Sequence, residues 1–204
     1  MSAQVLLRLK QEAEKKLRRP ITHAVITVPA YFLESQRVAT RKAGELAGLR
    51  VKALLDEPTA AALSEGGKDR SRMLVFDFGG GTLDISVVQR SGGNTRAIEY
   101  AGDNHLGGDD IDRGVAQLIK KWAADQGADI RDDNYEVQWS ILQQAEEVKK
   151  SLSAESSEEV VHLPGVRGEL CIDQQAFARV LAPLELRVRD LLKQLFEKSS
   201  LAPR

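Results

Sequence analysis

The chain has 204 residues, enough for one large domain or two small ones. Its 29 basic and 30 acidic residues give a formal net charge of −1, which argues against non-specific nucleic-acid binding, because that requires a basic field. One cysteine cannot cross-link a fold, and the sequence has no run of about 18 apolar residues that could span a membrane. These features predict an ordinary globular protein of a reducing compartment, the cytoplasm.

The first third of the chain alternates between helical and strand patterns. In order, the patterns predict an amphipathic helix over 3–18, a buried strand over 21–29, a helix over 34–47, a short strand over 51–55 and a helix from Pro58 onward. Gly48 suits the end of the second helix, because glycine adopts a left-handed conformation at little cost. Pro58 suits the first turn of the third helix.

Strands continue to about residue 102, and helices dominate after it. The remaining predicted elements are a buried strand over 72–78, strands over 83–90 and 96–102, helices over 108–126 and 134–152, a hairpin of 160–164 with 168–172, and a helix from the Asp173 cap to about Lys198. Cys171 lies between two apolar residues and is expected to be a small core residue. The order suggests an α/β layer followed by a smaller α+β subdomain.

A turn of three glycines and a threonine, 79–82, separates two of the predicted strands and is flanked by Asp77 and Asp84. Glycines let a ligand approach the main chain, and successive amides in such a turn can converge on an anion. Two carboxylates beside bound phosphates commonly hold Mg²⁺, often through water. The same residues also fit a tight hairpin whose aspartates bond their own turn, and the residue pattern leaves both interpretations open.

Two further segments place acids or glycines where ligands often bind. Glu57 lies between a strand and a helix that begins with proline, at the carboxyl edge of a sheet. An acid there also simply favours the helix dipole. The glycine-containing loop 101–110 opens a helix and is a candidate anion site, with a capped loop as the alternative; His105 is expected to make a local hydrogen bond.

The predicted helix over 134–152 has two distinct faces. Its apolar stripe consists of Val137, Ile141, Ala145, Val148 and Leu152. Its separate polar face consists of Glu146, Lys149, Lys150 and Ser153. Periodicity does not decide whether this polar face is solvated or lines a cleft where it contacts the base and ribose of a nucleotide.

Five segments carry motifs that are specific in combination: VITVPAYF (25–32), SQR (35–37), DEPTAAAL (56–63), FDFGGGTLD (76–84) and AGDNHLGGDD (101–110). In their order and separations they closely resemble the seventy-kilodalton heat-shock chaperone family, the DnaK-like proteins. The resemblance implies part of an actin-like (ribonuclease H-like) α/β ATPase fold of two lobes around a nucleotide cleft. The implied parts are the second half of the lobe I base (1–66), the start of the lobe II base (67–103), an inserted α+β subdomain at the tip of lobe II (104–185) and a helix returning toward the lobe II base (186–204).

The resemblance also implies roles for individual residues. Catalytic roles fall on Glu57, Asp77 and Thr82. Nucleotide contacts fall on Gly79, Gly80, Gly81, Thr82, Glu146, Lys149, Lys150 and Ser153. A magnesium ion, held through water, falls to Asp77 and Asp84, and Pro29 and Arg37 relay the nucleotide state to a substrate domain. The implied cofactors are ATP or ADP with Mg²⁺, and the implied partners are client polypeptides, a J-domain co-chaperone and a nucleotide-exchange factor.

The sequence departs from the family pattern in three places. Lys150 stands where many relatives have an arginine that stacks on the base, which lysine cannot do. Leu33 replaces a polar residue that would cap the following helix. The family's first phosphate loop, its late adenosine loop and its peptide-binding domain fall outside residues 1–204, so we expect the chain alone to bind ATP weakly and to hydrolyse it hardly at all.

Two other classes of protein fit part of the pattern. Actin-like filament proteins share the glycine turn and the Glu-Pro helix, but they do not usually combine the 29–32 and 101–110 motifs. A non-catalytic docking module for co-chaperones would use the subdomain after residue 104 without turning over ATP.

Overall fold

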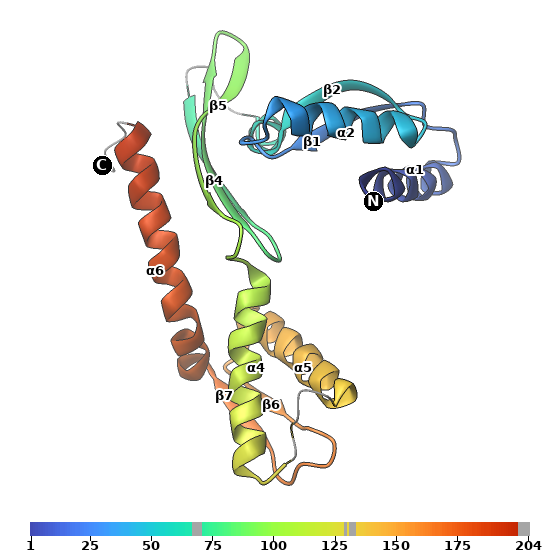
Figure 1. Ribbon diagram of the computed structural model, residues 1–204. Coiled ribbons are helices and arrows are strands. Elements are labelled where there is room, and N and C mark those ends of the chain that lie inside the picture. Colours follow the sequence, from blue (N-terminus) through green and yellow to red (C-terminus); the bar gives the residue numbers. More distant parts are fainter. Residues whose placement is uncertain (67–70, 129, 131–133, 200–204) are drawn as a thin grey trace. The chain divides into compact units, whose positions relative to one another are not determined.

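The computed structural model describes residues 1–66, 71–128, 130 and 134–199. The chain forms two compact units: unit 1 is Met1–Asp77, Ile85–Ala101 and Leu195–Arg204, and unit 2 is Phe78–Asp84 and Gly102–Gln194. The elements in chain order (Figure 1) are α1 (Ser2–Leu17), β1 (His23–Val28), α2 (Glu34–Leu46), β2 (Arg50–Asp56), α3 (Glu57–Ser64), β3 (Ser71–Phe78), β4 (Leu83–Ser91), β5 (Asn94–Asp103), α4 (Gly108–Asp125), α5 (Tyr135–Ser153), β6 (Glu158–Val161), β7 (Leu170–Asp173) and α6 (Gln174–Ser199). The structure is therefore mixed α/β, and the predicted order of elements is confirmed.

Unit 1 contains a β-α-β arrangement of β1, α2 and β2. The two strands are parallel, with His23 opposite Arg50 and Val28 opposite Asp56, so both strands end at the same edge. Gly48 follows α2 with φ +76°, which confirms the predicted left-handed helix end. The loop after β1 and the start of α3 consequently lie at one edge of this sheet.

The expected burial of the strands over 21–29 and 72–78 is wrong. Along β1, exposed residues alternate with partly buried ones as far as Val28, which is buried. β3 alternates in the same way, because it is an outer strand in a sheet of order β3-β4-β5. The central strand β4 is the buried one, with Leu83, Ile85 and Val88 fully enclosed. Position in the sheet, which composition does not report, decides burial here.

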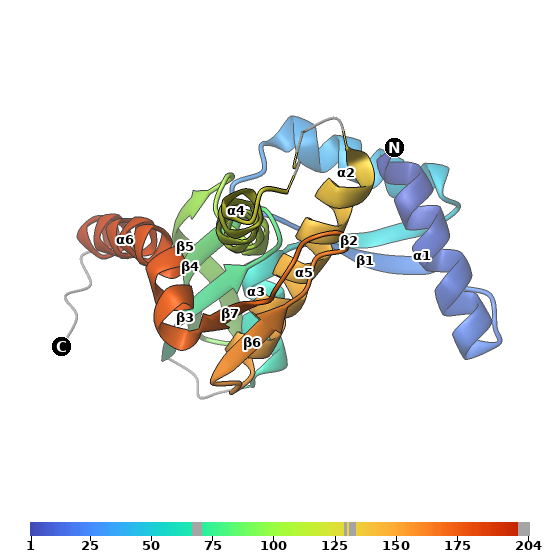
Figure 2. The same cartoon turned by 90° about the horizontal axis from the view of Figure 1, so that it is seen from below.

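Unit 2 has its core where α4 and α5 pack against β6, β7 and the start of α6 (Figure 2). The apolar stripe predicted for α5 is confirmed: Ile141, Ala145, Val148 and Leu152 are buried in this core and Val137 packs at its edge. β6 and β7 pair antiparallel, as the predicted hairpin requires. Asp173 accepts a hydrogen bond from the Ala176 amide at 2.7 Å, so the predicted cap of α6 is also confirmed.

Cys171 is exposed, so its predicted place in the core is wrong. Side chains alternate along β7, and Ile172 takes the inward position. The thiol donates to Glu158 at 3.2 Å, and this hydrogen bond to a carboxylate raises the pKa of Cys171.

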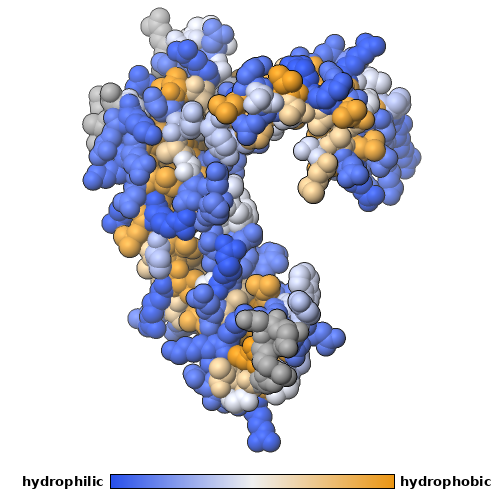
Figure 3. All heavy atoms as spheres, viewed as in Figure 1, coloured by the Kyte–Doolittle hydropathy of each residue, from blue (hydrophilic) through white to orange (hydrophobic). Residues whose placement is uncertain are grey.

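Among the described residues, no helix is both long enough and apolar enough to cross a membrane. On the face shown in Figure 3, apolar side chains lie among polar ones along α1 and α2. The exposed apolar residues of these two helices include Val5, Leu9 and Leu46.

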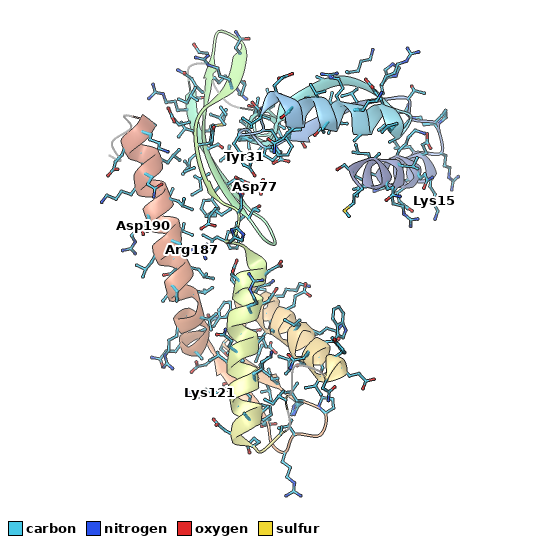
Figure 4. The ribbon with its side chains drawn as sticks, in the orientation of Figure 1. Lys15, Tyr31, Asp77, Lys121, Arg187 and Asp190 are labelled. Carbon is cyan, nitrogen blue, oxygen red and sulfur yellow. The ribbon has the colours of Figure 1, made fainter. Side chains whose placement is uncertain are left out.

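Within unit 2, Arg187 of α6 (Figure 4) ties that helix to the end of β5. Its guanidinium donates to Asp103 at 2.5 Å and to the His105 carbonyl at 2.9 Å. The His105 amide also donates to Asp103, which confirms the local hydrogen bond predicted for His105. Arg187 first, and then this amide, lower the pKa of Asp103.

We expect Arg187→Ala to lower the free energy of unfolding at neutral pH by about 1 kcal/mol, because the pair is partly exposed. The folded-state pKa of Asp103 lies below its unfolded value, so this stabilisation is complete above about pH 3.9 and is lost as the pH falls through the lowered pKa. Urea unfolding of wild type and variant, at neutral pH and in acid, measures both effects. Arg179→Ala is the control, since Arg179 contacts only the exposed Gln175 of the same helix among the hydrogen bonds of the described residues. A difference that persists unchanged in acid would contradict the assignment to Asp103.

Candidate nucleotide site

The glycine turn between β3 and β4 closes through one backbone hydrogen bond, from the Gly79 amide to the Thr82 carbonyl at 2.9 Å. Within the turn, the three glycines are exposed and Thr82 is partly buried. The turn does not stand alone, because the start of α4 packs directly against it within unit 2. The Gly108 amide donates to the Gly79 carbonyl at 2.9 Å, and the Asp109 amide donates to the Gly80 carbonyl at 2.7 Å.

These two hydrogen bonds fix the direction of the turn's peptide units. In a trans peptide, the carbonyl of one residue and the N–H of the next point in opposite directions. The Gly79 and Gly80 carbonyls point at α4, so the N–H groups of Gly80 and Gly81 point away from it. No described residue accepts a hydrogen bond from either of these two amides. The turn therefore presents adjacent donors, and donation by α4 to its carbonyls polarises them further.

Gly107 makes this contact possible by having no side chain. A Cβ there would lie within 2.7 Å of the Gly81 nitrogen, and closer still to the Gly80 carbonyl. A Cβ on Gly108 would meet only the Lys149 Nζ at 3.4 Å, with other atoms at ordinary contact distances. The close contact between the glycine turn and the start of α4 thus depends on glycine at position 107.

Of the two interpretations left open for the 101–110 segment, the structure supports the capped loop and not the anion site, because protein acceptors occupy the amides at the start of α4. Gly107 donates to Asp110 Oδ2 at 2.8 Å, the next two amides hold the turn, and the Asp110 amide donates to the Gly107 carbonyl at 3.1 Å. Burial acts to raise the pKa of Asp110, but Arg113 and the Gly107 amide hold it below its usual value. This segment therefore supports the glycine turn, while its own amides are already occupied.

Of the two candidate metal carboxylates, Asp84 lies in unit 2 with the turn and Asp77 lies in unit 1 at the end of β3 (Figure 4). Asp84 lies against β5: a Cβ on Gly102 would be 2.7 Å from its Oδ1. Gly102 thus leaves room for this carboxylate. The described residues contain no group of three or more metal-ligating side chains. A donor set of two carboxylates suits Mg²⁺ that completes its coordination with water and phosphate oxygens.

The polar face of α5 separates into two parts. Lys149 donates to Asp112 of α4 at 2.7 Å, and the two side chains are only 19% and 16% exposed. Lys150 pairs with Glu146 at 2.7 Å on the exposed side of α5. Each partner favours the charged form of the other, so the pKa of Glu146 is lowered and that of Lys150 is raised. Ser153 is exposed at the end of the helix. The structure therefore places Lys149, but not Lys150, beside the turn's support.

In unit 1, Arg37 joins the loop after β1 to the end of β2. Its guanidinium donates to Asp56 Oδ1 at 2.7 Å, to the Phe32 carbonyl at 3.1 Å and to the Ala30 carbonyl at 3.3 Å. Glu57 follows Asp56 as the first residue of α3 and is partly buried. Pro29 starts the same loop, and its carbonyl accepts from the Phe32 amide at 3.1 Å. Arg37 thus holds the neighbourhood of Glu57 in place.

The loss of a capping side chain at Leu33 is confirmed, since Leu33 makes no side-chain cap at the start of α2. Gln36 compensates by accepting a hydrogen bond from the Leu33 amide at 2.8 Å. This is the second half of a capping box, formed without the first.

Comparison with known proteins gives consistent matches. A family model described as Hsp70 protein matches residues 1–203. The chaperone protein DnaK of Prochlorococcus marinus (strain MIT 9515) is 46% identical over 163 residues, which cover 78% of this chain and 26% of that protein. The chaperone protein dnaK of Emiliania huxleyi is 46% identical over 156 residues, covering 75% and 25%. The chain spans about a quarter of the length of these relatives.

Proposed function

Because this chain belongs to the Hsp70 family, we propose that it forms part of the nucleotide-binding domain of a chaperone ATPase, in which ATP binding and hydrolysis control the binding and release of client polypeptides. The proposed domain has the actin-like fold, with 1–66 in lobe I, 67–103 in the base of lobe II, 104–185 in its tip and 186–204 returning to the base. Co-chaperones that stimulate hydrolysis or exchange nucleotide are the expected partners.

The observation that carries this proposal is the direction of the Gly80 and Gly81 amides. Both peptide units are held by α4 through their carbonyls, at 2.9 Å and 2.7 Å, and direct their N–H groups outward. A hairpin needs no such support, whereas an anion site needs fixed donors that do not reorganise on binding. Phosphate oxygens are the acceptors that match adjacent amides of this kind.

In the proposed mechanism the glycine turn binds the phosphates, two aspartates hold the metal ion, and Glu57 positions the attacking water. The Gly80 and Gly81 amides and the Thr82 hydroxyl donate to phosphate oxygens. When bound, Mg²⁺ supplies positive charge that neutralises the phosphates. Asp77 and Asp84 would hold that ion through water. Glu57 orients the attacking water and accepts its proton, a role that fits a carboxylate at the carboxyl edge of a sheet.

The test compares three ligands in the complete protein. With Mg²⁺ present, we expect ATP and ADP to bind at least about a hundredfold more tightly than adenosine, because hydrogen bonds to a charged group contribute about 1.5–3 kcal/mol each. Isothermal titration with and without a chelator gives the affinities, and removal of Mg²⁺ should weaken ATP far more than adenosine. Equal affinities for ATP and adenosine would overturn the phosphate role of the turn.

A further inference from the structure

The ion pair between Asp112 and Lys149 joins α4 to α5 close to the glycine turn. Lys149 Nζ donates to Asp112 Oδ2 at 2.7 Å, and the residues are 37 positions apart in the chain. The ammonium lies 3.4 Å from the point that a Cβ on Gly108 would occupy. Gly108 in turn donates to the Gly79 carbonyl at 2.9 Å. The lysine head group is therefore held beside the part of α4 that supports the turn.

Asp112 destabilises the folded protein at this position. Its Oδ2 has the lysine as partner, but its Oδ1 is buried and has no hydrogen-bond partner among the described residues. A buried oxygen without a partner is destabilising, and an apolar pair of similar volume would remove that cost. Proteins keep destabilising polar groups of this kind mainly at functional sites. The unpartnered oxygen of Asp112 therefore points to a role in function.

The ion pair also fixes the position of the Lys149 head group, whereas that of Lys150 is not fixed in this way. A free lysine side chain samples many rotamers, and fixing it on a ligand costs entropy. Asp112 fixes the Lys149 ammonium in advance by accepting a hydrogen bond from one of its three N–H groups, so two donors remain for a ligand. Lys150 is 68% exposed, and the ion pair that it makes within the described part of the chain is with Glu146 of its own helix, an exposed pair that contributes little.

We propose that Asp112 is a positioning residue for nucleotide binding, which acts by holding Lys149 in place and does not itself touch the nucleotide. The inference rests on the proposed function, because it requires a nucleotide at the turn. It concerns a residue of α4 that lies in none of the predicted contact sets. The fixed ammonium donates to oxygen atoms of the bound nucleotide, while the carboxylate sets its position and balances its charge.

A double-mutant cycle in the complete protein tests this. We expect Asp112→Asn and Lys149→Met each to weaken ADP binding about tenfold, and the double variant to bind no more weakly than Lys149→Met alone. That non-additivity is the signature of action through the lysine; a purely structural role would add a further loss in the Lys149→Met background. Asp125→Asn is the matched control, because it makes the same change at an exposed aspartate at the far end of α4, away from the turn.

The outcomes separate the two proposals. No ADP binding by the wild type overturns both. Weakening by Lys149→Met without weakening by Asp112→Asn, or full additivity of the two, overturns the role of Asp112 alone. If Asp112→Asn does not fold, Asp112→Glu keeps the charge but displaces the ammonium by one methylene, and we expect about a threefold loss in the wild-type background and none with Lys149→Met. Unchanged affinity in Asp112→Glu would equally overturn the inference.

Discussion

Replacing Gly107 with alanine should weaken ATP binding about a hundredfold while leaving adenosine binding almost unchanged. A Cβ at this position would lie within 2.7 Å of the Gly81 nitrogen, so α4 and the turn must separate. Separation breaks the hydrogen bonds from Gly108 and Asp109 that aim the turn's amides. Loss of two charge-assisted hydrogen bonds to phosphate corresponds to about 3 kcal/mol, or roughly two orders of magnitude in affinity.

The backbone at Gly107 makes the experiment clean. Its φ is −168°, an extended conformation open to any residue, so the variant reports on the contact and not on backbone strain. Overpacking should also lower the free energy of unfolding by about 1–3 kcal/mol, which thermal unfolding would register. Binding is therefore measured well below the unfolding transition, with adenosine as the internal check that the protein is folded.

Gly108→Ala is the matched control. The nearest atom to its Cβ is the flexible end of Lys149 at 3.4 Å, and the amide that holds Gly79 remains. We expect its ATP affinity to stay within about threefold of wild type, since a neighbour at such a distance moves by only a few tenths of an ångström. If Gly107→Ala and Gly108→Ala behave alike, or if Gly107→Ala weakens adenosine as much as ATP, support of the turn by α4 is not what positions the phosphate.

The structural role of the glycine motifs could be predicted only in part from the sequence. The residues between 101 and 110 were open to two interpretations, a ligand-binding helix start or a capped loop, because a glycine before a helix is compatible with both. The structure supports the capped loop, and it adds a use that neither interpretation contained: Gly107 lacks a side chain so that the Gly79–Gly81 turn can approach. No local pattern reveals that one glycine motif packs on another, since the two are separated by a hairpin in sequence.

The spacing of apolar and polar residues predicted the two faces of α5 but not which elements each face contacts. The apolar stripe of α5 was predictable because it depends only on spacing within one helix, and it is buried as expected. The split of its polar face was not predictable, because Lys149 owes its burial to Asp112 on another helix. Cys171 failed for the same reason: alternation along a short strand leaves two registers, and only packing chooses between Cys171 and Ile172.

The resemblance to the chaperone family identified functional candidates that residue spacing and chemistry alone did not single out. Arg37 has no periodic signature, yet it contacts Asp56 at 2.7 Å and two carbonyls of the loop after β1. Its place next to Glu57 follows from the parallel pairing of β1 with β2, which brings both carboxyl ends to one edge. The roles of Pro29 and Arg37 as relay residues stay predictions, but the contacts give a physical route by which movement at Glu57 would reach the loop.

Glu57→Ala should reduce ATP turnover in the complete protein by a factor of about a hundred or more, with ATP affinity kept within severalfold. General-base or water-positioning groups contribute typically 10²–10⁴-fold to the rate. If Glu57 served only the dipole of α3, its removal would cost a few tenths of a kcal/mol of stability and leave turnover intact. Single-turnover hydrolysis of bound ATP, followed beside equilibrium binding, separates the two roles because it isolates the chemical step from product release.

The same helix supplies the control. Glu65→Ala removes an acid at the C-terminal end of α3, an eight-residue helix, and should leave both turnover and affinity unchanged. Glu57→Gln refines the result, since the amide keeps the size of the side chain and can still orient water but cannot accept a proton at neutral pH. Turnover near wild type in Glu57→Gln with loss in Glu57→Ala would make Glu57 a water-orienting residue only. Unchanged turnover in both would remove Glu57 from the mechanism and leave the turn, with its amides held by α4, as a binding site without an assigned catalyst.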